Sequence, residues 1–599
     1  MIGIENGERL KQRMFALANC DWQGKVRFQE GNELCLSLEE ACLTVEAPDI
    51  SAAGRGLFQA ACALRDGKNV PALHQKRHIA SCGMMLDMSR GGVMTVEAVK
   101  RMIDAHIALG LNMMMLYTED TYTVPEATYL GYLRGRYTEE EMRELDDYAA
   151  AFGVELIPCV QTLAHLEQFL QWDVNQKIKD NDCVLMIDEP RTYEWIRAAL
   201  TALRRCFRTD RIHIGMDEAH GVGLGEYYQK HGPVDRFALL TRHLNKVVDI
   251  CKELNFKPIM WSDMFYRLGS KMNDYYDTDA VVPQSVITEI PDVALCYWDY
   301  YHTDEAFYTG MLEGHRQMGK EVVFAGGIWT WSGLLPHVRK TNATAYPALR
   351  ACLKSGINTV LATAWGDDGC ETDYRLALNQ LPIYSEHVWL GEKCTKAEVE
   401  HMGELLTGMS RVCYDAMGAF YANEEDHRPG KGLFYCDPLY PLTEGLWDLN
   451  GYRDELEKGI KTLECHLDDA RCEYAWLAMR IALDKLDWVN ILRPTYIRGD
   501  KAAMLVLATE KLPALRELYD RMMFVWREQW ESGRKRNGWE TICARLGAVI
   551  ARLDDAQRIL IRWAEGKIER VEELEEIPLC ASRLYGRQDY HTMSFPQFR

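Results

Sequence analysis

Two adjacent carboxylates, Asp217 and Glu218, end an apolar stretch that reads RIHIGMDE from Arg211 onward. Like charges side by side at the end of a strand are costly unless the protein uses them. Crowding among aromatic side chains is expected to raise the pKa of one carboxyl group while the other stays ionised. An acid beside an anion is the combination that glycoside hydrolysis requires.

The position of the pair in its strand predicts a separate role for each carboxylate. The period of two along HIGMDE places Asp217 on the face opposite Ile214 and Met216, so we expect Asp217 to point into a pocket. Glu218 follows where the strand gives way to a loop. Adjacent residues rarely place carboxyl groups across a glycosidic bond at the ~5–5.5 Å separation of retaining enzymes with a protein nucleophile. The nucleophile must then come from elsewhere, and the substrate's own 2-acetamido group can serve.

Acidic and aromatic side chains also end other predicted strands. A single Trp is usually a core residue, and a single Asp after a strand is usually a turn former or a helix cap. Seven strands that end in this way favour a shared pocket, whose Trp rings could stack on the apolar face of a sugar. Besides the pair, these residues are Asp87, Glu119, Asp120, Trp261, Asp263, Trp298, Asp299, Trp329, Trp331, Trp365 and Asp367.

Eight short apolar stretches alternate with helical patterns and predict a (β/α)8 TIM barrel over residues 76–394. No Gly-rich phosphate loop follows the first strand, which lowers a dinucleotide-binding interpretation. Residues 1–75 predict a small α/β domain, and residues 395–599 predict an all-helical C-terminal domain. The eight predicted strands are Gly83–Ser89, Asn112–Asp120, Val154–Val160, Ile212–Glu218, Lys257–Asp263, Val293–Tyr301, Glu321–Trp331 and Asn358–Asp368.

The composition narrows the class of partner. The 599 residues carry a net charge of -20, which argues against binding to nucleic acid or to an anionic membrane surface. No apolar run approaches the ~20 residues that span a bilayer. The 19 cysteines are scattered without a C-x-x-C pair, and the first residues lack a signal-peptide pattern, so we expect a cytoplasmic protein with free thiols. Three roles stay open for the helical region. It could simply pack on the barrel, it could form a wall of the pocket, or it could form a homodimer surface.

These motifs resemble those of the family-20 glycoside hydrolases, the β-N-acetylhexosaminidases. The family strand H-x-G-G-D-E is similar to HIGMDE, with Met216 in place of the second Gly. CGMMLDMSR resembles the first-strand motif R-G-x-x-L-D-x-x-R, IPCVQTLAH resembles a third-strand segment that ends in P-G-H, and AWGD resembles an eighth-strand W-x-E. The overall sequence pattern is also similar to that of a subgroup of exo-acting bacterial members with a helical C-terminal region.

The resemblance implies an exo-acting, retaining enzyme that removes terminal β-linked GlcNAc or GalNAc by substrate-assisted catalysis. No metal-binding cluster is visible in the sequence, so we expect no metal and no cofactor. The resemblance also implies that Asp217 orients the acetamido group and that Glu218 is the acid/base. His165 would support the acid, with Asp120 as its carboxylate partner. Trp365 would line the pocket and Asp367 would hold sugar hydroxyls; we expect further binding by Trp261, Trp298, Tyr300 and Trp329.

The sequence departs from the family pattern at three places. The substrate-clamping Arg falls at Cys82, so other groups must recognise O3 and O4. The Asp of the third-strand segment falls at Gln161. The tyrosine that holds the acetamido oxygen has no clear match among Tyr297, Tyr300 and Tyr301, and the strand period favours Tyr300 because it shares a face with Trp298.

Two other functions stay open at this point. One is a metal-dependent hydrolase that uses His213, Asp217 and Glu218, although H-x-x-x-D-E is not a recognised ligand spacing. The other is a catalytically inactive sugar-binding protein on a barrel scaffold. An inactive binder has no need of both carboxylates, and both are present. The sequence does not separate GlcNAc from GalNAc.

Overall fold

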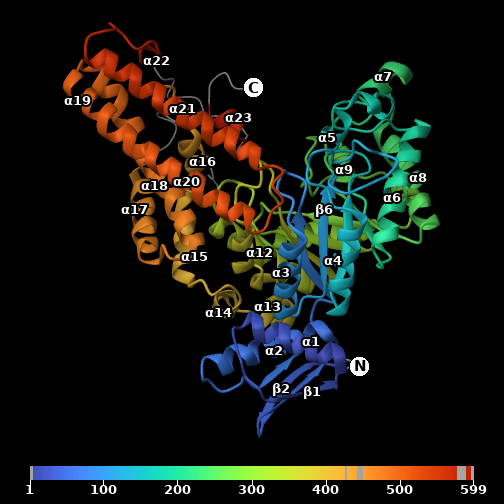
Figure 1. Cartoon of the computed structure of the whole chain (residues 1–599). Coiled ribbons are helices and arrows are strands. Elements are labelled where there is room, and N and C mark those ends of the chain that lie inside the picture. Colours follow the sequence, from blue (N-terminus) through green and yellow to red (C-terminus); the bar gives the residue numbers. More distant parts are fainter. Residues whose placement is uncertain (1–3, 425–427, 442–449, 577–588, 595–599) are drawn as a thin grey trace.

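The computed structural model describes residues 4–424, 428–441, 450–576 and 589–594. Along the chain it shows a small sheet with two helices, then a closed barrel, then a group of helices (Figure 1). The sheet region lies at one end of the barrel, and the C-terminal helices lie beside the other end.

The N-terminal sheet has the strand order β1-β3-β2-β4. Helix α2 lies between this sheet and barrel helix α3, and its small residues permit the close approach. A Cβ at Gly54 would lie 2.3 Å from a methyl carbon of Ile107, and one at Gly56 would lie 3.1 Å from Leu34. The elements are α1 (Ile4–Leu17), β1 (Lys25–Glu30), β2 (Leu34–Glu39), β3 (Cys42–Ala47), α2 (Ile50–Arg65) and β4 (Leu73–Gln75).

The barrel contains all eight predicted strands, and the prediction of a closed (β/α)8 fold is confirmed. Its order is β10-β11-β12-β5-β6-β7-β8-β9, and every neighbouring pair is parallel. The strands are β5 (Ser81–Asp87), β6 (Met113–Glu119), β7 (Glu155–Val160), β8 (Arg211–His213), β9 (Lys257–Trp261), β10 (Ala294–Trp298), β11 (Val322–Gly327) and β12 (Thr359–Ala364).

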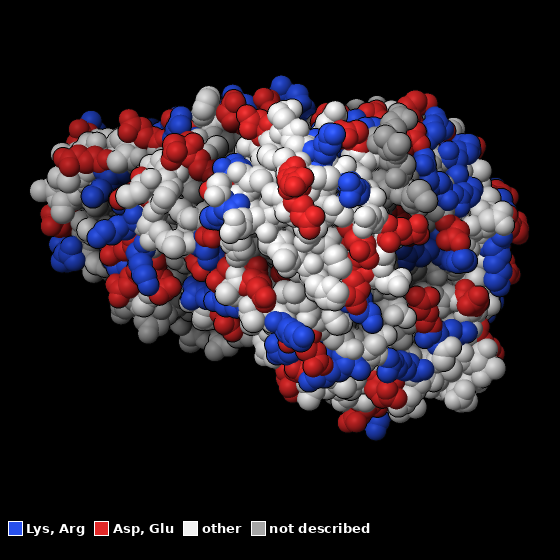
Figure 2. All heavy atoms as spheres, turned by 90° about the horizontal axis from the view of Figure 1, so that it is seen from below, with Lys and Arg blue, Asp and Glu red and all other residues white. Residues whose placement is uncertain are grey.

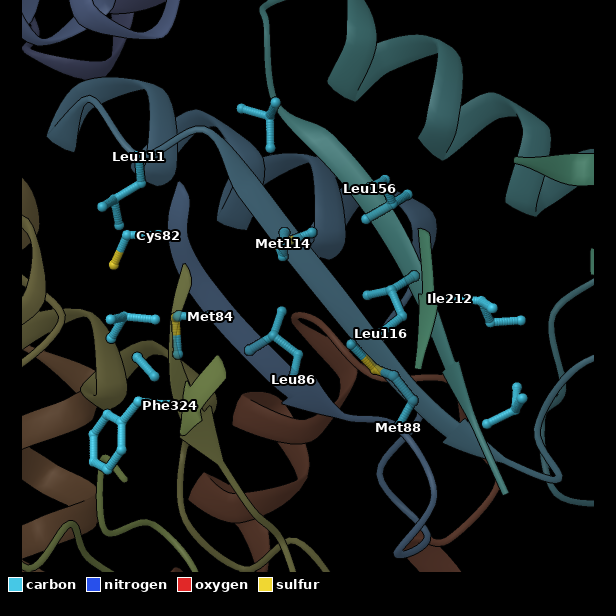
Figure 3. Close-up of a cluster of buried hydrophobic side chains, with 14 of the residues drawn as sticks. Cys82, Met84, Leu86, Met88, Leu111, Met114, Leu116, Leu156, Ile212 and Phe324 are labelled. Carbon is cyan, nitrogen blue, oxygen red and sulfur yellow. The ribbon is translucent and has the colours of Figure 1, made fainter. Parts of the chain in front are cut away.

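Strand alternation divides the barrel residues between two apolar clusters. Met85, Met115 and Trp261 belong to the cluster inside the barrel. Met84 and Leu116 belong to the outer cluster against the helices, which Figure 3 shows in close-up. The strands are thus apolar on both faces, as parallel strands covered by helices require.

Six of the eleven barrel helices begin at a residue whose side chain caps the helix. Thr95 caps α3 and Gly110 ends it with a φ of 70°, and Thr138 with Glu141 forms a capping box on α4. Such caps satisfy backbone groups that a helix end leaves unpaired. The helices are α3 (Val96–Leu109), α4 (Glu139–Ala151), α5 (Glu167–Leu170), α6 (Pro190–Cys206), α7 (Glu226–His231), α8 (Arg236–Glu253), α9 (Asp263–Gly269), α10 (Gln284–Glu289), α11 (Glu305–Gln317), α12 (Val338–Lys354) and α13 (Pro382–Leu390).

The C-terminal region is helical, as predicted, and has its own apolar cluster. Helix α14 is an exception, because its Val399 and Met402 pack in the barrel cluster. The elements are α14 (Lys396–Thr407), α15 (Arg411–Met417), α16 (Arg428–Tyr435), α17 (Asn450–Leu463), α18 (Ala470–Ile497), α19 (Lys501–Val506), α20 (Leu512–Glu531), α21 (Trp539–Ala564), α22 (Glu572–Glu575) and α23 (Tyr590–Met593).

The surface mixes charges of both signs. Among the described residues on the face shown in Figure 2, acidic and basic side chains are interspersed rather than gathered by sign. Over the ranges that the structure describes, no helix combines the length and the apolar character needed to cross a bilayer.

Candidate active site

A cavity of about 310 Å³ opens at the carboxyl ends of the barrel strands. This volume lies near the lower end of the range for small-molecule sites, and the carboxyl ends of the strands are where barrel enzymes place their chemistry. The lining residues are Arg90, His165, Asp217, Glu218, Trp261, Trp298, Tyr300, Tyr301, Trp331, Trp365 and Asp367.

Asp217 reaches the cavity from a loop and not, as predicted, from a strand. Strand β8 already ends at His213, and the following backbone turns sharply, with positive φ at Gly215 (72°), Met216 (74°) and Glu218 (49°). The turn buries Met216 in the outer cluster and directs both carboxylates to the cavity. Side chains rarely adopt such φ values, and backbone strain of this kind concentrates at functional sites.

Three neighbours fix the position of Asp217. The Gln161 side-chain N–H donates a hydrogen bond of 2.7 Å to Asp217 Oδ1. The Oε1 atom of the same side chain accepts one of 3.1 Å from the Met216 N–H. His165 Nε2 lies 3.1 Å from Asp217 Oδ2. The residue that departs from the family pattern at position 161 therefore still holds the first carboxylate.

Glu218 shares His165 with its neighbour and has two further partners. His165 Nε2 lies 3.5 Å from Glu218 Oε2. The Tyr275 hydroxyl donates to Glu218 Oε1 at 3.4 Å, and the Glu218 N–H donates to Asp263 Oδ2 at 2.9 Å. The carboxylate is the more open of the two, with 38% of its side chain exposed against 14% for Asp217.

The predicted split of pKa values within the pair is wrong. Burial raises the pKa of Asp217 and of Glu218, but the adjacent His165 outweighs it and holds both values below their ordinary ones. Burial likewise opposes the charge on His165, yet Asp217 raises its pKa well above the ordinary value. Two other carboxyl groups near the pair have raised pKa values. Burial raises the pKa of Asp263 strongly and that of Glu119 to about 7.

His165 contacts Asp217 and Glu218 and not Asp120, whereas the charge of Glu119 acts on it. Asp120 is buried and its carboxylate lies 2.9 Å from Arg134, so the predicted pairing of Asp120 with His165 is wrong. A bulge in β6 between Tyr117 and Glu119, together with a φ of 46° at Glu119, shifts the strand alternation at this point. The charge of Glu119 contributes to the raised pKa of His165.

Four of the five predicted aromatic positions line the cavity. Trp261, Trp298, Tyr300 and Trp365 do so, whereas Trp329 does not. Trp329 is buried beneath Trp331, with ring centroids 4.4 Å apart, and its indole N–H donates to the Tyr300 carbonyl at 2.9 Å.

The tyrosine candidates also separate. Tyr300 and Tyr301 both line the cavity, while Tyr297 packs in the outer cluster and donates to Asp299 at 2.8 Å. Trp298 and Tyr300 lie on the same face, as the strand period predicted, and their rings stack with centroids 5.3 Å apart.

Arg90 is a cavity-lining residue that sequence reasoning missed. Its guanidinium lies 3.2 Å from Asp87 and 3.2 Å from Glu119, and 5.4 Å from the centroid of the Trp365 ring. Cys82 belongs to the outer cluster, away from the cavity. The signal was present in the sequence, because Arg90 closes CGMMLDMSR three residues after Asp87 at the strand end.

A hydrogen-bonded chain joins the carboxylate pair to Arg90. Gln161 donates to Asp217 and, at 2.9 Å, to the Tyr117 hydroxyl, which donates to Glu119 at 2.8 Å. Glu119 in turn contacts Arg90. This chain links the loop after β8, which carries Asp217, to the segment after β5, which carries Arg90.

His213 lies below the cavity rather than in it. It is fully buried, its ring lies 4.3 Å from that of Trp261, and burial lowers its pKa to about 3. In the ranges that the structure describes, no three His, Cys, Asp or Glu side chains form a group that could hold a metal ion.

Two parts of the chain match family models. Residues 82–290 match the model described as "Glycosyl hydrolase family 20, catalytic domain". Residues 415–593 match the one described as "Glycoside Hydrolase 20C C-terminal domain". Their order along the chain is that of the barrel and the helical region.

Known relatives are similar over part of their length. A beta-hexosaminidase of Emericella nidulans is 24% identical over 259 residues, which are 37% of this chain and 42% of that protein. Flavobacterium johnsoniae chitobiase has a similar fold, with a TM-score of 0.52 at 15% identity and 93% of each chain covered. The GH20 exo-β-N-acetylglucosaminidase of Vibrio harveyi, solved with N-acetylglucosamine, gives a TM-score of 0.51 at 17% identity and covers 68% of this chain and 73% of its own. The chain thus spans less than half of the curated relative, and the structural likenesses concern the fold alone.

Proposed function

Because this chain belongs to glycoside hydrolase family 20, we propose that it is an exo-acting, retaining β-N-acetylhexosaminidase. One observation carries the proposal: Asp217, Glu218 and His165 lie together in a cavity walled by aromatic rings. The names of the relatives, beta-hexosaminidase and exo-β-N-acetylglucosaminidase, support the same substrate class.

In the proposed first step, the acetamido carbonyl oxygen of the substrate attacks the anomeric carbon. The bond from that carbon to the leaving oxygen breaks, and Glu218 gives its proton to this oxygen. Asp217 accepts a hydrogen bond from the acetamido N–H and stabilises the positive charge of the oxazolinium ion that forms. Water then attacks the same carbon from the opposite face, the bond from that carbon to the acetamido oxygen breaks and restores the acetamido group, and Glu218 takes a proton from the water. The two inversions together retain the configuration.

The proton for this step needs a source, because the pKa of Glu218 is lowered and that of His165 is raised. We propose that His165, 3.5 Å from Glu218, passes its proton to Glu218 when a bound sugar displaces water from the cavity. Tyr300 is the proposed partner of the acetamido oxygen, and Arg90 with Asp367 would hold the sugar hydroxyls. The choice between GlcNAc and GalNAc stays open.

The decisive experiment concerns the nucleophile. We expect nitrophenyl β-N-acetylglucosaminide to be cleaved, the matching glucoside to be a very poor substrate, and fluorination of the acetamido methyl to slow turnover steeply. Each change removes or weakens the carbonyl nucleophile. A covalent adduct of a 2-fluoro glycoside on any protein carboxylate would contradict this mechanism.

The two other functions are tested by the same assay. We expect activity to survive excess chelator; a loss that a divalent ion restores would favour the metal-dependent hydrolase. Binding of N-acetylglucosamine without turnover of any β-N-acetylhexosaminide would favour the inactive sugar-binding protein. We also propose a cytoplasmic location and no cofactor. The free thiols of Cys82, Cys159 and Cys296 are compatible with a reducing compartment.

A further inference from the structure

Side chains from the C-terminal helices hold the segment that follows β12, residues 365–372, which we call the β12 loop. Arg545 on α21 contacts Asp368 at 2.6 Å and Glu371 at 2.6 Å. Lys431 on α16 contacts the same two carboxylates at 2.7 and 2.8 Å. Only 7% of the Arg545 side chain and 1% of the Lys431 side chain are exposed.

The main chain of the β12 loop is held as well. Arg534 donates to the carbonyl oxygens of Cys370 at 2.6 Å and Thr372 at 2.8 Å, and Arg545 donates to that of Asp368 at 2.8 Å. Two cations thus meet two carboxylates in a buried, electrically balanced cluster, and a third cation binds backbone. Such charged hydrogen bonds are the strong ones.

The turn between two of the same helices also packs against the segment that follows β5. The turn between α20 and α21, residues 532–538, donates from the Lys535 N–H to the Val93 carbonyl at 2.8 Å and accepts from the Thr95 N–H at 2.9 Å. At Gly538, where φ is 94°, a Cβ would lie 1.7 Å from the Gly91 carbonyl oxygen. This contact lies next to Arg90.

The two segments carry one side of the cavity. The β12 loop presents Trp365 and Asp367, and the segment after β5 presents Arg90. Asp87 joins them, because its carboxylate contacts Arg90 and accepts a hydrogen bond of 2.9 Å from the Gly366 N–H. Asp367 is followed directly by Asp368, which the C-terminal cations hold.

We propose that the C-terminal helices complete the sugar-binding wall, and that Arg545, Lys431, Arg534 and Gly538 are positioning residues for Arg90, Trp365 and Asp367. The proposal rests on the proposed function, since it assigns these three lining residues to the sugar. The carboxylate pair lies on the loop after β8 and His165 lies on the loop after β7, and none of these four residues contacts either loop through the interactions described above. Sugar affinity should therefore depend on the C-terminal helices more than the chemical step does.

The test compares Arg545→Gln with Arg552→Gln. Arg552 is a matched control, because it lies on the same helix and contacts Asp437 at 2.6 Å and Asp555 at 2.7 Å, both within the helical region. For Arg545→Gln we expect KM for nitrophenyl β-N-acetylglucosaminide to rise about tenfold, the factor for one lost charged hydrogen bond to the sugar. We expect kcat to change less than about threefold, with an unchanged pH profile. Arg545→Lys should recover part of the KM, and Arg552→Gln should keep the wild-type value.

A second readout does not depend on catalysis. Amide hydrogen exchange in residues 366–372 should speed up in Arg545→Gln and not in Arg552→Gln. If Arg545→Gln failed to fold, Gly538→Ala would serve, because its added methyl group meets the Gly91 backbone beside Arg90.

Equal KM and equal exchange in the Arg545 and Arg552 variants would overturn the proposal, as would a loss confined to kcat. If the wild-type protein cleaved no glycoside, the proposed function would fall, together with the assignment of this wall to a sugar. The exchange measurement would then still decide whether Arg545 positions the β12 loop.

Discussion

At the scale of single residues, His165 governs the charge of the site. It lies within 3.5 Å of both carboxylates and, with its raised pKa, stays cationic beside them. A carboxylate next to a cation is a poor acid until the proton moves. Glu218, the proposed acid, and Asp217, the proposed orienting anion, thus share one cationic neighbour, and we propose that the bound substrate gives them different charges.

The first prediction concerns the acid. Glu218→Gln should keep the fold and lower kcat by about 10² to 10⁴, the usual contribution of general acid catalysis. The loss should be smaller for nitrophenyl glycosides than for an N-acetylglucosamine disaccharide, since a good leaving group needs less protonation. Steady-state kinetics on both substrates checks this, and equal losses would contradict the assignment.

The second prediction concerns Glu119, whose pKa burial raises to about 7. A raised carboxyl pKa favours the folded state at low pH, and this contribution is lost as the pH rises from the unfolded value near 4.5 through about 7. Relative to the wild type, Glu119→Gln should therefore gain free energy of unfolding over this interval, on the order of 3 kcal/mol. Urea unfolding at several pH values measures the difference, and parallel curves for the two proteins would show that the pKa is not raised.

At the scale of elements, the ends of β7 and β8 approach so closely that only glycine fits between them. A Cβ at Gly215 would lie 2.1 Å from the side-chain amide oxygen of Gln161 and 2.8 Å from the main-chain carbonyl oxygen of Val160. The φ of Gly215 is 72°. Gln161 is the residue that holds Asp217. The close approach of the two strand ends thus positions Asp217, a proposed catalytic side chain.

The third prediction tests this approach with two glycines of similar φ. Gly215→Ala should displace Gln161 and lower kcat about 100-fold, the effect of a misplacement near 1 Å. Gly319→Ala is the control, because Gly319 has a φ of 70° with no atom within 4 Å of its Cβ position. It should cost about 1 kcal/mol of stability and leave kcat unchanged. Similar kcat values for the two variants would argue against the role of Gln161.

The limits of sequence reasoning also lie at this scale. The eight strands, the helices between them and the Asp217–Glu218 pair follow from apolar periodicity and strand-end composition, whereas the place of His165 beside the pair followed from the family resemblance. Asp120 and Trp329 were wrong because both assignments needed the course of the backbone beyond the regular strand. A bulge re-aims β6 at Glu119, and the chain after β11 turns Trp331 rather than Trp329 to the cavity. Arg90 was missed because its position depends on the loop after β5.

At the scale of the whole molecule, two apolar clusters and a buried ion pair connect the three regions. Arg55 on α2 reaches Glu386 on α13 with two contacts of 2.7 Å, and both side chains are almost fully buried. The N-terminal sheet is thereby fastened to the end of the barrel that lies away from the cavity. The boundaries near residues 75 and 394 and the homodimer stay predictions.

The fourth prediction concerns this fastening. Arg55→Met should lower the free energy of unfolding by about 3 to 5 kcal/mol, because it leaves the Glu386 carboxylate buried without its cation. Below the unfolding transition, kcat and KM should be those of the wild type. Arg55→Met with Glu386→Leu should recover most of the loss. Urea unfolding checks the series, and a double variant as unstable as the single one would contradict the explanation.

The contact between Gly91 and Gly538 joins two segments that are synthesised at different times. A ribosome that adds about 5 to 20 residues per second needs roughly 10 to 35 seconds to pass from Asp368 to Arg545. During this interval the last barrel strand has been synthesised, but the residues that hold the β12 loop and the segment around Gly91 are not all present. A nascent chain thus contains Glu218 and Asp217, the proposed acid and orienting carboxylate, before it contains every residue proposed to position the sugar-binding wall.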